Sequence, residues 1–314
     1  MKKIIDILTA VDTCVDILLD CGSERPKFGQ AEQFINDYNM TLGGSCGIFA
    51  SGIAKLGLHT VVLGAVGDDI FGSFVKVELE KNGVDTSFLR TENGIKTGIG
   101  FSLCLNNSDR SILTYNGSID SAVSEDFSDE ILQKTRHLHI GSYYLMHQLR
   151  GAYPDILKKA RTYGVPISLD TNWDPSEVWD GGIMEVLPYV DIFFPNENEA
   201  MFIAKRDCVE EAMDVLTKIV PVVALKQGNR GASLYVDGKV FTAEALDVTV
   251  QDTVGAGDSF DAGFVYAYLN GMPMEECLKI GCICGSCNTK YPGGTKGQPT
   301  ETQLKSLMEE TGMR

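Results

Sequence analysis

The amino-acid sequence predicts an α/β fold: a doubly wound, mostly parallel sheet with helices on both faces, together with a small β lid. Two observations lead to this prediction. From about residue 135 onward, short apolar segments typical of buried strands alternate with longer stretches of helical pattern. Such alternation is typical of parallel sheets whose crossover helices cover both faces. Residues 12–40 and 97–115 are more polar or hairpin-like, so we interpret them as a projecting lid.

Length and charge limit the possible functions. A chain of 314 residues is ample for one large α/β core with an appendage, and we predict a single domain over residues 1–314. The formal net charge of −16 argues against nucleic acid or an anionic membrane as a partner. Any phosphate-bearing ligand must therefore be held by local N–H groups and a few placed cations.

The first residues predict a buried strand rather than a signal peptide. Asp6 interrupts the short apolar run that follows the two opening lysines, and Ile4–Val11 is typical of a core strand. No run of 18 apolar residues occurs, so we expect no transmembrane helix. The nine cysteines and the absence of an export signal indicate reduced thiols and a cytoplasmic protein.

The N-terminal half is expected to alternate between strands and helices. A Gly-rich turn precedes a helix that Gly57 ends, and Asp68 or Asp69 is expected to cap the next helix. The predicted elements are a helix after Leu42–Ser45, a strand at Thr60–Val66, a helix closed by Asn82-Gly83, and strands at Thr97–Leu105 and Arg110–Tyr115 around a turn at Asn106–Asp109.

The C-terminal half predicts the main part of the parallel sheet. Its strands are expected at His137–Gly141, Ile167–Asp170, Asp191–Phe194 and Val222–Lys226, followed by a hairpin of Ser233–Val236 and Lys239–Ala243 around Asp237-Gly238. Helices are expected at Asp258–Asn270, Met274–Asn288 and Thr300–Thr311. Ligands of such sheets bind at the carboxyl ends of the strands.

The stretch Gln251–Phe264 carries the strongest chemical signal. Gly255, Ala256 and Gly257 precede Asp258 and an apolar, helix-competent run. Small residues at a helix start let backbone N–H groups converge on an anion. A carboxylate beside such an anion hole is useful if it accepts a proton from a hydroxyl that attacks the anion. The alternative is that Asp258 is only the N-cap of the helix.

The full string DTVGAGDSFDAGF resembles the C-terminal signature of the ribokinase-like (PfkB-type) carbohydrate kinases. The resemblance implies an ATP- and Mg²⁺-dependent kinase with Asp258 as catalytic base and the N–H groups of Gly255, Ala256 and Gly257 as the anion hole. Two alternatives remain open: a nucleoside kinase on the same fold, and a catalytically silent sugar-binding or regulatory protein.

The same resemblance implies a site for the phosphoryl acceptor. Its predicted residues are Asp12, Asp16, Gly43, Gly44, Ser45, Asp170 and Asn172. Asp12 could equally be only a strand-end residue. Family members often have Asn where this chain has Ile48, and relatives that take acidic sugars often have Arg where this chain has Asp174. We therefore expect a neutral sugar or polyol as the acceptor.

For the nucleotide and metals, the resemblance implies a further set of residues. Predicted nucleotide contacts are Asn196, Lys226, Gly228, Gly231 and Asn288. Asn196 and Glu199 form an NxxE pattern suited to Mg²⁺ held through water, although the pair could simply cap a helix. Asp252 corresponds to a potassium site in some relatives, and the lid of relatives pairs with a second subunit, which predicts a homodimer. Cys282, Cys284 and Cys287 are better explained as small buried residues than as zinc ligands.

Overall fold

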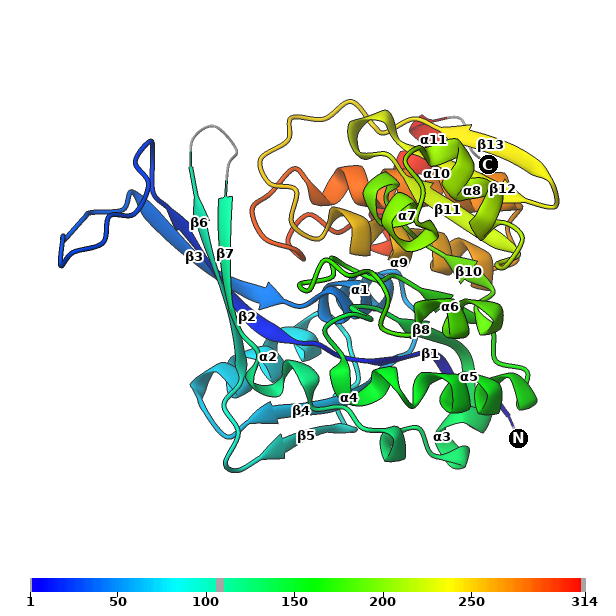
Figure 1. Ribbon diagram of the computed structural model, residues 1–314, viewed down its shortest axis with the longest axis horizontal. Helices are drawn as coiled ribbons and strands as arrows, with labels where there is room; N and C mark the ends of the chain where they lie inside the picture. The colour runs from blue at the N-terminus through cyan, green and yellow to red at the C-terminus, as the bar shows by residue number, and fades with distance from the viewer. Residues whose placement is uncertain (1, 106–109, 312–314) are drawn as a thin grey trace.

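The structure, a computed structural model, describes residues 2–105 and 110–311, and its strands form two separate sheets (Figure 1). The larger sheet has nine strands in the order β13 (Lys239–Ala243), β12 (Ala232–Val236), β11 (Val222–Lys226), β10 (Ile192–Phe193), β9 (Ile167–Leu169), β8 (Thr135–Ile140), β1 (Ile5–Ala10), β4 (Thr60–Gly67) and β5 (Leu89–Glu92). All neighbours from β11 to β5 are parallel, and β12 and β13 add an antiparallel edge. This confirms the predicted mostly parallel sheet.

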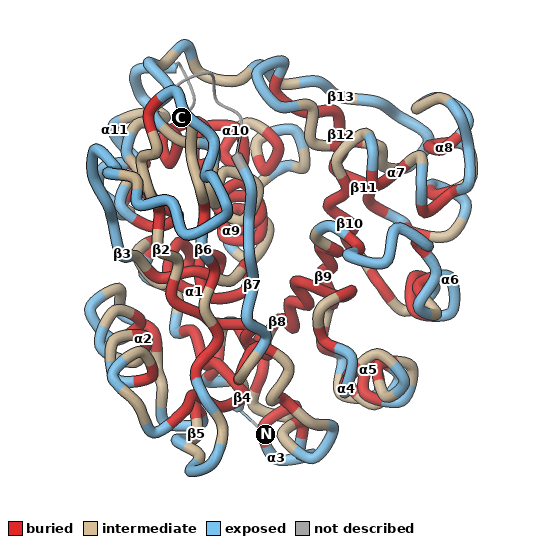
Figure 2. The backbone as a smooth tube through the Cα atoms, turned by 60° about the vertical axis from the view of Figure 1, so that its left-hand side comes forward, coloured by how far each residue is buried: buried red, intermediate tan, exposed pale blue. Residues whose placement is uncertain are grey.

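Helices cover both faces of this sheet. One face carries α3 (Asp129–Lys134), α4 (His147–Arg150), α5 (Tyr153–Thr162), α6 (Ile183–Val186), α7 (Glu197–Ala204) and α8 (Val209–Leu216); the other carries α1 (Ser45–Lys55), α2 (Ile70–Lys81), α9 (Ala256–Leu269), α10 (Met274–Asn288) and α11 (Glu301–Glu310). Successive side chains of a strand point to opposite faces. In β10, Ile192 therefore joins the core under α9 and α10, whereas Phe193 joins the core under α5. Figure 2 shows the buried residues concentrated along these strands.

The second sheet projects from the main body on the side of α2 (Figure 1). Its order is β3 (Asp37–Gly43), β2 (Cys14–Asp20), β6 (Gly98–Cys104) and β7 (Arg110–Tyr115). β2 pairs antiparallel with β3 and parallel with β6. The turn expected at 106–109 lies outside the described residues. This sheet occupies the segments that the sequence predicted as a lid.

Several local predictions are confirmed. Asp69 caps α2 by accepting a hydrogen bond from Gly72 N–H at 2.8 Å. The Asp237-Gly238 turn joins β12 and β13, with Val236 opposite Lys239. The short strand β5 was not predicted. All nine cysteines are free thiols, and no helix in the described part of the chain is long and apolar enough to cross a membrane.

Candidate active site

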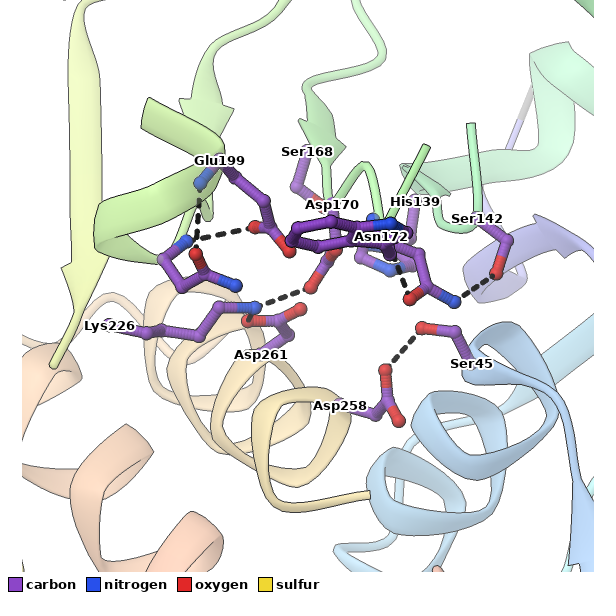
Figure 3. Close-up of polar contacts among 12 residues, drawn as sticks. Ser45, His139, Ser142, Ser168, Asp170, Asn172, Glu199, Lys226, Asp258 and Asp261 are labelled. Carbon is purple, nitrogen blue, oxygen red and sulfur yellow. Dashed lines mark hydrogen bonds and ion pairs between the residues drawn. The ribbon is translucent and has the colours of Figure 1, made fainter. Parts of the chain in front are cut away.

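The candidate site lies where the carboxyl ends of the central strands face the start of α9. Asp12 follows β1, Ser142 follows β8, Asp170 follows β9, and Lys226 ends β11. Figure 3 shows these strand ends and the loops after them above Asp258, with Lys226 and Asp261 to one side and Ser45 to the other. Residues far apart in sequence meet here because parallel strands end at the same edge of the sheet.

The start of α9 is shaped by Gly255. This residue is the N-cap of the helix with φ of 73°, and no side chain caps the first turn. A Cβ at Gly255 would lie 2.8 Å from the Cα of Gly294 and 2.9 Å from Ile48 Cγ2, so only glycine fits. Ala256 N–H makes a long bond, 3.3 Å, to the carbonyl of Thr253. An uncapped first turn with the positive end of the helix dipole suits an anion.

Asp258 lies in this first turn and is not the cap, so the alternative of a simple N-cap is wrong. Its Oδ1 accepts a hydrogen bond from Ser45 Oγ. Burial and the nearby charge of Asp170 raise the pKa of Asp258 to about 7, although Ser45 and Lys226 act in the opposite direction. A carboxylate with such a pKa is a better proton acceptor near neutral pH than an ordinary aspartate.

Lys226 provides positive charge beside this carboxylate. Its ammonium pairs with Asp170 Oδ2 and lies 3.4 Å from Asp261 Oδ1. It also lies 3.3 Å from the position that a Cβ on Gly257 would take, which places it next to the first turn of α9. The neighbouring carboxylates raise the pKa of Lys226, and the ammonium holds the pKa of Asp170 at about 2, so this pair is ionised.

Asp261 was not predicted from the sequence. Its side chain is fully buried, Oδ2 has no hydrogen-bond partner among the described residues, and burial raises its pKa well above the ordinary value. A signal was available: Asp261 follows Asp258 by three residues on a helix, which places both carboxylates on one face. A carboxylate in an apolar helical run needs a buried partner, and that partner is Lys226.

The predicted acceptor residues from the N-terminal part lie around Asp16 and the start of α1. Asp12 accepts from the N–H groups of Ser45 at 3.0 Å and Cys46 at 2.9 Å, and from Ser142 Oγ. Asp12 therefore fixes the start of α1, and a contact of its carboxylate with substrate stays a prediction. The glycine at 43 makes room for the carboxylate of Asp16, which would collide with any Cβ there.

Asn172 is held in the left-handed region, with φ of 57°. Its backbone N–H donates to Asp170 Oδ1 at 2.8 Å, and its Nδ2 donates to Ser142 Oγ at 3.3 Å. The bond to Ser142 keeps this side chain in the same network as Asp12. The structure thus brings together most of the predicted acceptor residues.

Two sequence arguments about the acceptor are wrong. Ile48 is 3% exposed and packs against Gly255 and Gly294, so it contributes to packing and does not read the acceptor. Asp174 is also buried, and it accepts from Ser176 N–H at 2.9 Å and Trp179 N–H at 2.7 Å. Because its carboxylate closes its own loop, it gives no reason to exclude an acidic acceptor.

Asn196 and Glu199 form a reciprocal capping box at the start of α7. Asn196 Oδ1 accepts from Glu199 N–H, and Glu199 Oε2 accepts from Asn196 N–H, both at 2.9 Å. Burial and the charge of Asp170 raise the pKa of Glu199 to about 7. The cap that the sequence left as an alternative is therefore present, and the role of the pair toward Mg²⁺ stays a prediction.

Asp252 joins two loops beside the start of α9. Its Oδ1 accepts from Val254 N–H at 3.0 Å, and its Oδ2 accepts from Gly293 N–H at 2.9 Å. Asn288 supports the same loop by donating from Nδ2 to the carbonyl of Val254 at 2.7 Å. Asn288 is fully buried, so the structure places it behind the loop rather than on a ligand-facing surface.

A cavity of about 490 Å³ opens beside the first turn of α9. Lys226, Gly228 and Gly231 line it, whereas Asn196 and Asn288 do not. No side chain lies within 4 Å of a Cβ built on Gly228, so a flat ligand could approach this backbone closely. Its apolar walls include Leu246, Val248, Val250 and Phe260. The cavity joins an apolar compartment to the uncapped start of α9, a combination that suits a nucleotide.

The cysteines near the cavity belong to the core. Cys282, Cys284 and Cys287 are all buried in the apolar cluster that α10 forms with α9. Burial raises the pKa of Cys284 and Cys282, which disfavours the thiolates that a metal would need. No metal-binding group of three or more His, Cys, Asp or Glu residues occurs within residues 2–105 and 110–311.

Comparison with known proteins places this geometry in a family context. The family model described as pfkB family carbohydrate kinase matches residues 9–301. A 5-dehydro-2-deoxygluconokinase from Geobacillus thermodenitrificans is 27% identical over 324 residues, which cover 98% of this chain and 94% of the relative. A ribokinase from Arabidopsis thaliana complexed with ribose and ATP superposes with a TM-score of 0.83 at 23% identity, covering 98% of this chain and 99% of that one. A putative ribokinase II from E. coli in complex with ATP and Mg²⁺ gives a TM-score of 0.84 at 23% identity, with the same coverage.

Proposed function

Because the chain belongs to the pfkB family of carbohydrate kinases, we propose that it transfers the terminal phosphoryl group of ATP to a hydroxyl of a small neutral sugar or polyol. In this proposal Asp258 is the general base and the first turn of α9 is the anion hole. One observation carries it: a buried carboxylate that already accepts a hydrogen bond from a hydroxyl, Ser45 Oγ, lies in an uncapped helix start.

The proposed proton transfer is late. A carboxylate with a pKa of about 7 cannot deprotonate an alcohol in advance, so Asp258 takes the proton as the phosphoryl group leaves ADP. The N–H groups of residues 255–257 stabilise the charge on the transferring phosphate, and Lys226 adds a cation beside Gly257. Positioning by these groups supplies most of the catalysis.

We infer that Asn196 and Glu199 hold Mg²⁺ through water. The single oxygen of the Asn196 side chain and Oε2 of Glu199 already accept backbone N–H groups in the capping box, which leaves Oε1 of Glu199 to accept from a water of the ion. Mg²⁺ keeps several waters when protein carboxylates hold it, which suits such a pair. When bound, the ion neutralises charge on the phosphate oxygens.

The proposal of a neutral acceptor rests on the carboxylates around the site. Asp16 can accept hydrogen bonds from hydroxyls and would repel an acidic substrate, whereas the charge of Asp170 is already balanced by Lys226. The site would be closed by residues 12–40 and 97–115, which excludes water as a competing acceptor. A screen of neutral sugars, polyols, sugar acids and nucleosides with an ADP-release assay tests this. Turnover confined to sugar acids or to nucleosides would refute the neutral acceptor.

The projecting sheet supports the proposal of a homodimer. Its register aligns Met40, Ile17, Phe101 and Leu113 across all four strands on one face, opposite the face that carries Asp16. Phe101 is 37% exposed and Leu113 59% exposed in the isolated chain. An exposed apolar face of this kind is typical of an association surface. Sedimentation showing only monomer at micromolar concentration would refute the dimer.

A monovalent cation near Asp252 is the last part of the proposal. Both oxygens of this carboxylate engage backbone N–H groups, so a K⁺ ion would be held mainly by carbonyls of the loops that Asp252 joins. Such an ion would stabilise the loop that leads into the anion hole. Activity that is unchanged when K⁺ is replaced by tetramethylammonium would remove this part of the proposal.

A further inference from the structure

A continuous chain of hydrogen bonds leads from Asp258 to the loop after β9. Ser45 donates from Oγ to Asp258 and from its backbone N–H to Asp12 Oδ2. Ser142 Oγ donates to the same oxygen of Asp12 and accepts from Asn172 Nδ2 at 3.3 Å. Figure 3 shows both ends of this chain, with Ser45 beside Asp258 and Ser142 beside Asn172.

We propose that Ser45 and Ser142 are positioning residues for phosphoryl transfer. Ser45 holds the carboxylate of Asp258 in place until the acceptor hydroxyl takes over that hydrogen bond. Ser142 holds Asp12, and through it the start of α1, in register with Asp258. This inference rests on the proposed function and assigns these serines a task other than direct contact with the sugar.

Burial makes this chain energetically significant. Ser45 is 8% exposed, Asp12 is 2% exposed and Ser142 is fully buried. A buried carboxylate that loses one hydrogen-bond donor keeps the desolvation penalty without the compensating bond. Asp12 cannot exchange Ser142 for bulk water, so removal of that hydroxyl must displace Asp12 or the helix start that it holds.

The backbone of Ser142 gives a second, independent argument. Its φ is 50°, in the left-handed region that glycine adopts without strain. A non-glycine residue in a sparsely populated region is strained and persists where the surroundings require it. The hydrogen bonds to Asp12 and Asn172 are made by the hydroxyl that glycine would lack. The serine is therefore explained by its side chain.

The pKa of Asp258 depends on the groups around it, and the substitution of Ser45 removes one of them. The groups that act on this carboxylate come from four other elements and from α9 itself: Asp12 after β1, Cys46 on α1, Asp170 after β9, Lys226 on β11 and Asp261 on α9. Ser45 favours the ionised form of Asp258 by donating to it, so its removal raises the pKa of that carboxyl. Ser142 does not touch Asp258 and acts on it only through Asp12: it favours the ionised form of Asp12, whose charge raises the pKa of Asp258.

The test compares Ser45→Ala, Ser142→Gly and the double variant, with Ser51→Ala as the matched control. Ser51 is also buried on α1, but its Oγ donates to the carbonyl of Gly47 outside the chain of bonds. We expect kcat to fall about 10- to 100-fold for Ser45→Ala and about 10-fold for Ser142→Gly, because small displacements of reacting groups are costly. The double variant should be no worse than the worse single variant, since both act through one chain.

Two readouts separate positioning from other roles. The acid limb of the pH dependence of kcat/KM should move to higher pH in Ser45→Ala. It should not move to higher pH in Ser142→Gly, because loss of Ser142 weakens the negative charge of Asp12 that raises the pKa of Asp258. An increase only in the KM for the acceptor, with kcat and the acid limb unchanged, would overturn the proposal and make Ser45 a substrate contact. Losses that multiply in the double variant would overturn the coupling between the two serines.

A measurement without turnover keeps this inference separate from the proposed function. In protein labelled with ¹³C at aspartate carboxyls, the Asp258 signal is assigned by its loss in Asp258→Asn. Its titration should move to higher pH in Ser45→Ala. If the titration of Asp258 moves in this way but the protein phosphorylates no acceptor, the hydrogen-bond chain is supported and the proposed phosphoryl transfer is refuted. An unchanged titration in an active enzyme would refute the chain.

Discussion

Replacing Lys226 with methionine removes the cation from a group of buried carboxylates at the site. Lys226 and Asp170 form an ion pair whose side chains are 14% and 7% exposed. Holding the pKa of Asp170 at about 2, below its ordinary 3.8, corresponds to about 2 kcal/mol at neutral pH. Without the ammonium, burial destabilises the ionised carboxylate of Asp170 with no opposing charge. Breaking a buried ion pair typically costs about 3–5 kcal/mol. We therefore expect Lys226→Met to lower the free energy of unfolding by about 2–5 kcal/mol at pH 7.5.

The pH dependence of this loss follows from the sign of the shift. Asp170 has a lowered pKa, so its ion pair stabilises the fold above about pH 4, and that stability is lost as pH falls toward 2. In Lys226→Met the carboxylate has no counter-charge and can relieve the penalty by protonation. The cost should consequently be smaller at pH 5 than at pH 7.5.

Urea unfolding at both pH values measures these free energies. Lys279→Met is the matched control, because it removes an exposed pair with Glu275 whose side chains are 41% and 49% exposed, and should cost less than about 0.5 kcal/mol. Adding Asp170→Asn to Lys226→Met should restore part of the stability by removing the uncompensated charge. A loss below about 1 kcal/mol, or one that is equal at both pH values, would refute the electrostatic reasoning.

Three further predictions concern the base, the anion hole and the projecting sheet. Asp258→Asn should lower kcat about 10²- to 10⁴-fold, while calorimetry shows unchanged ATP affinity. In the wild-type enzyme, kcat/KM should fall as the pH drops below about 7, because Asp258 must be ionised. Wild-type turnover in the variant would remove this residue from the mechanism. Gly255→Ala should lower the thermal midpoint by several degrees, since the Cβ would meet Gly294 at 2.8 Å in a left-handed backbone, and an unchanged midpoint would contradict that geometry. Phe101→Lys should shift sedimentation toward monomer without unfolding the chain, and a dimer that persists would place the interface elsewhere.

The elements that the sequence predicted correctly are those set by local rules. Short apolar segments predicted the strands, Asp68 or Asp69 was expected to cap one helix, and the cap at Asn196 was an alternative left open. The string at residues 255–258 predicted a helix start without a bulky side chain, which the structure contains. These features depend on neighbours within a few residues, so one sequence is sufficient to predict them.

The errors arise where partners lie far apart in sequence. Ile48 was interpreted as a departure at the acceptor site, but the residues it packs against, Gly255 and Gly294, lie more than 200 positions away. Asp174 is a different case: its partners, Ser176 and Trp179, lie within five residues, but the turn that brings them together was not predicted. The Lys226–Asp261 contact and the bond from Ser142 to Asp12 also require the strand order of the sheet, which periodicity alone does not supply.

The two faces of the projecting sheet have a thermodynamic consequence. The same four strands carry Asp16 on one side and the apolar row through Phe101 on the other. If sugar binding and subunit pairing both favour the same arrangement of these strands, each must strengthen the other, and thermodynamic linkage makes the two factors equal. Saturating acceptor should then lower the dimer dissociation constant, and dilution should weaken sugar affinity in equal measure.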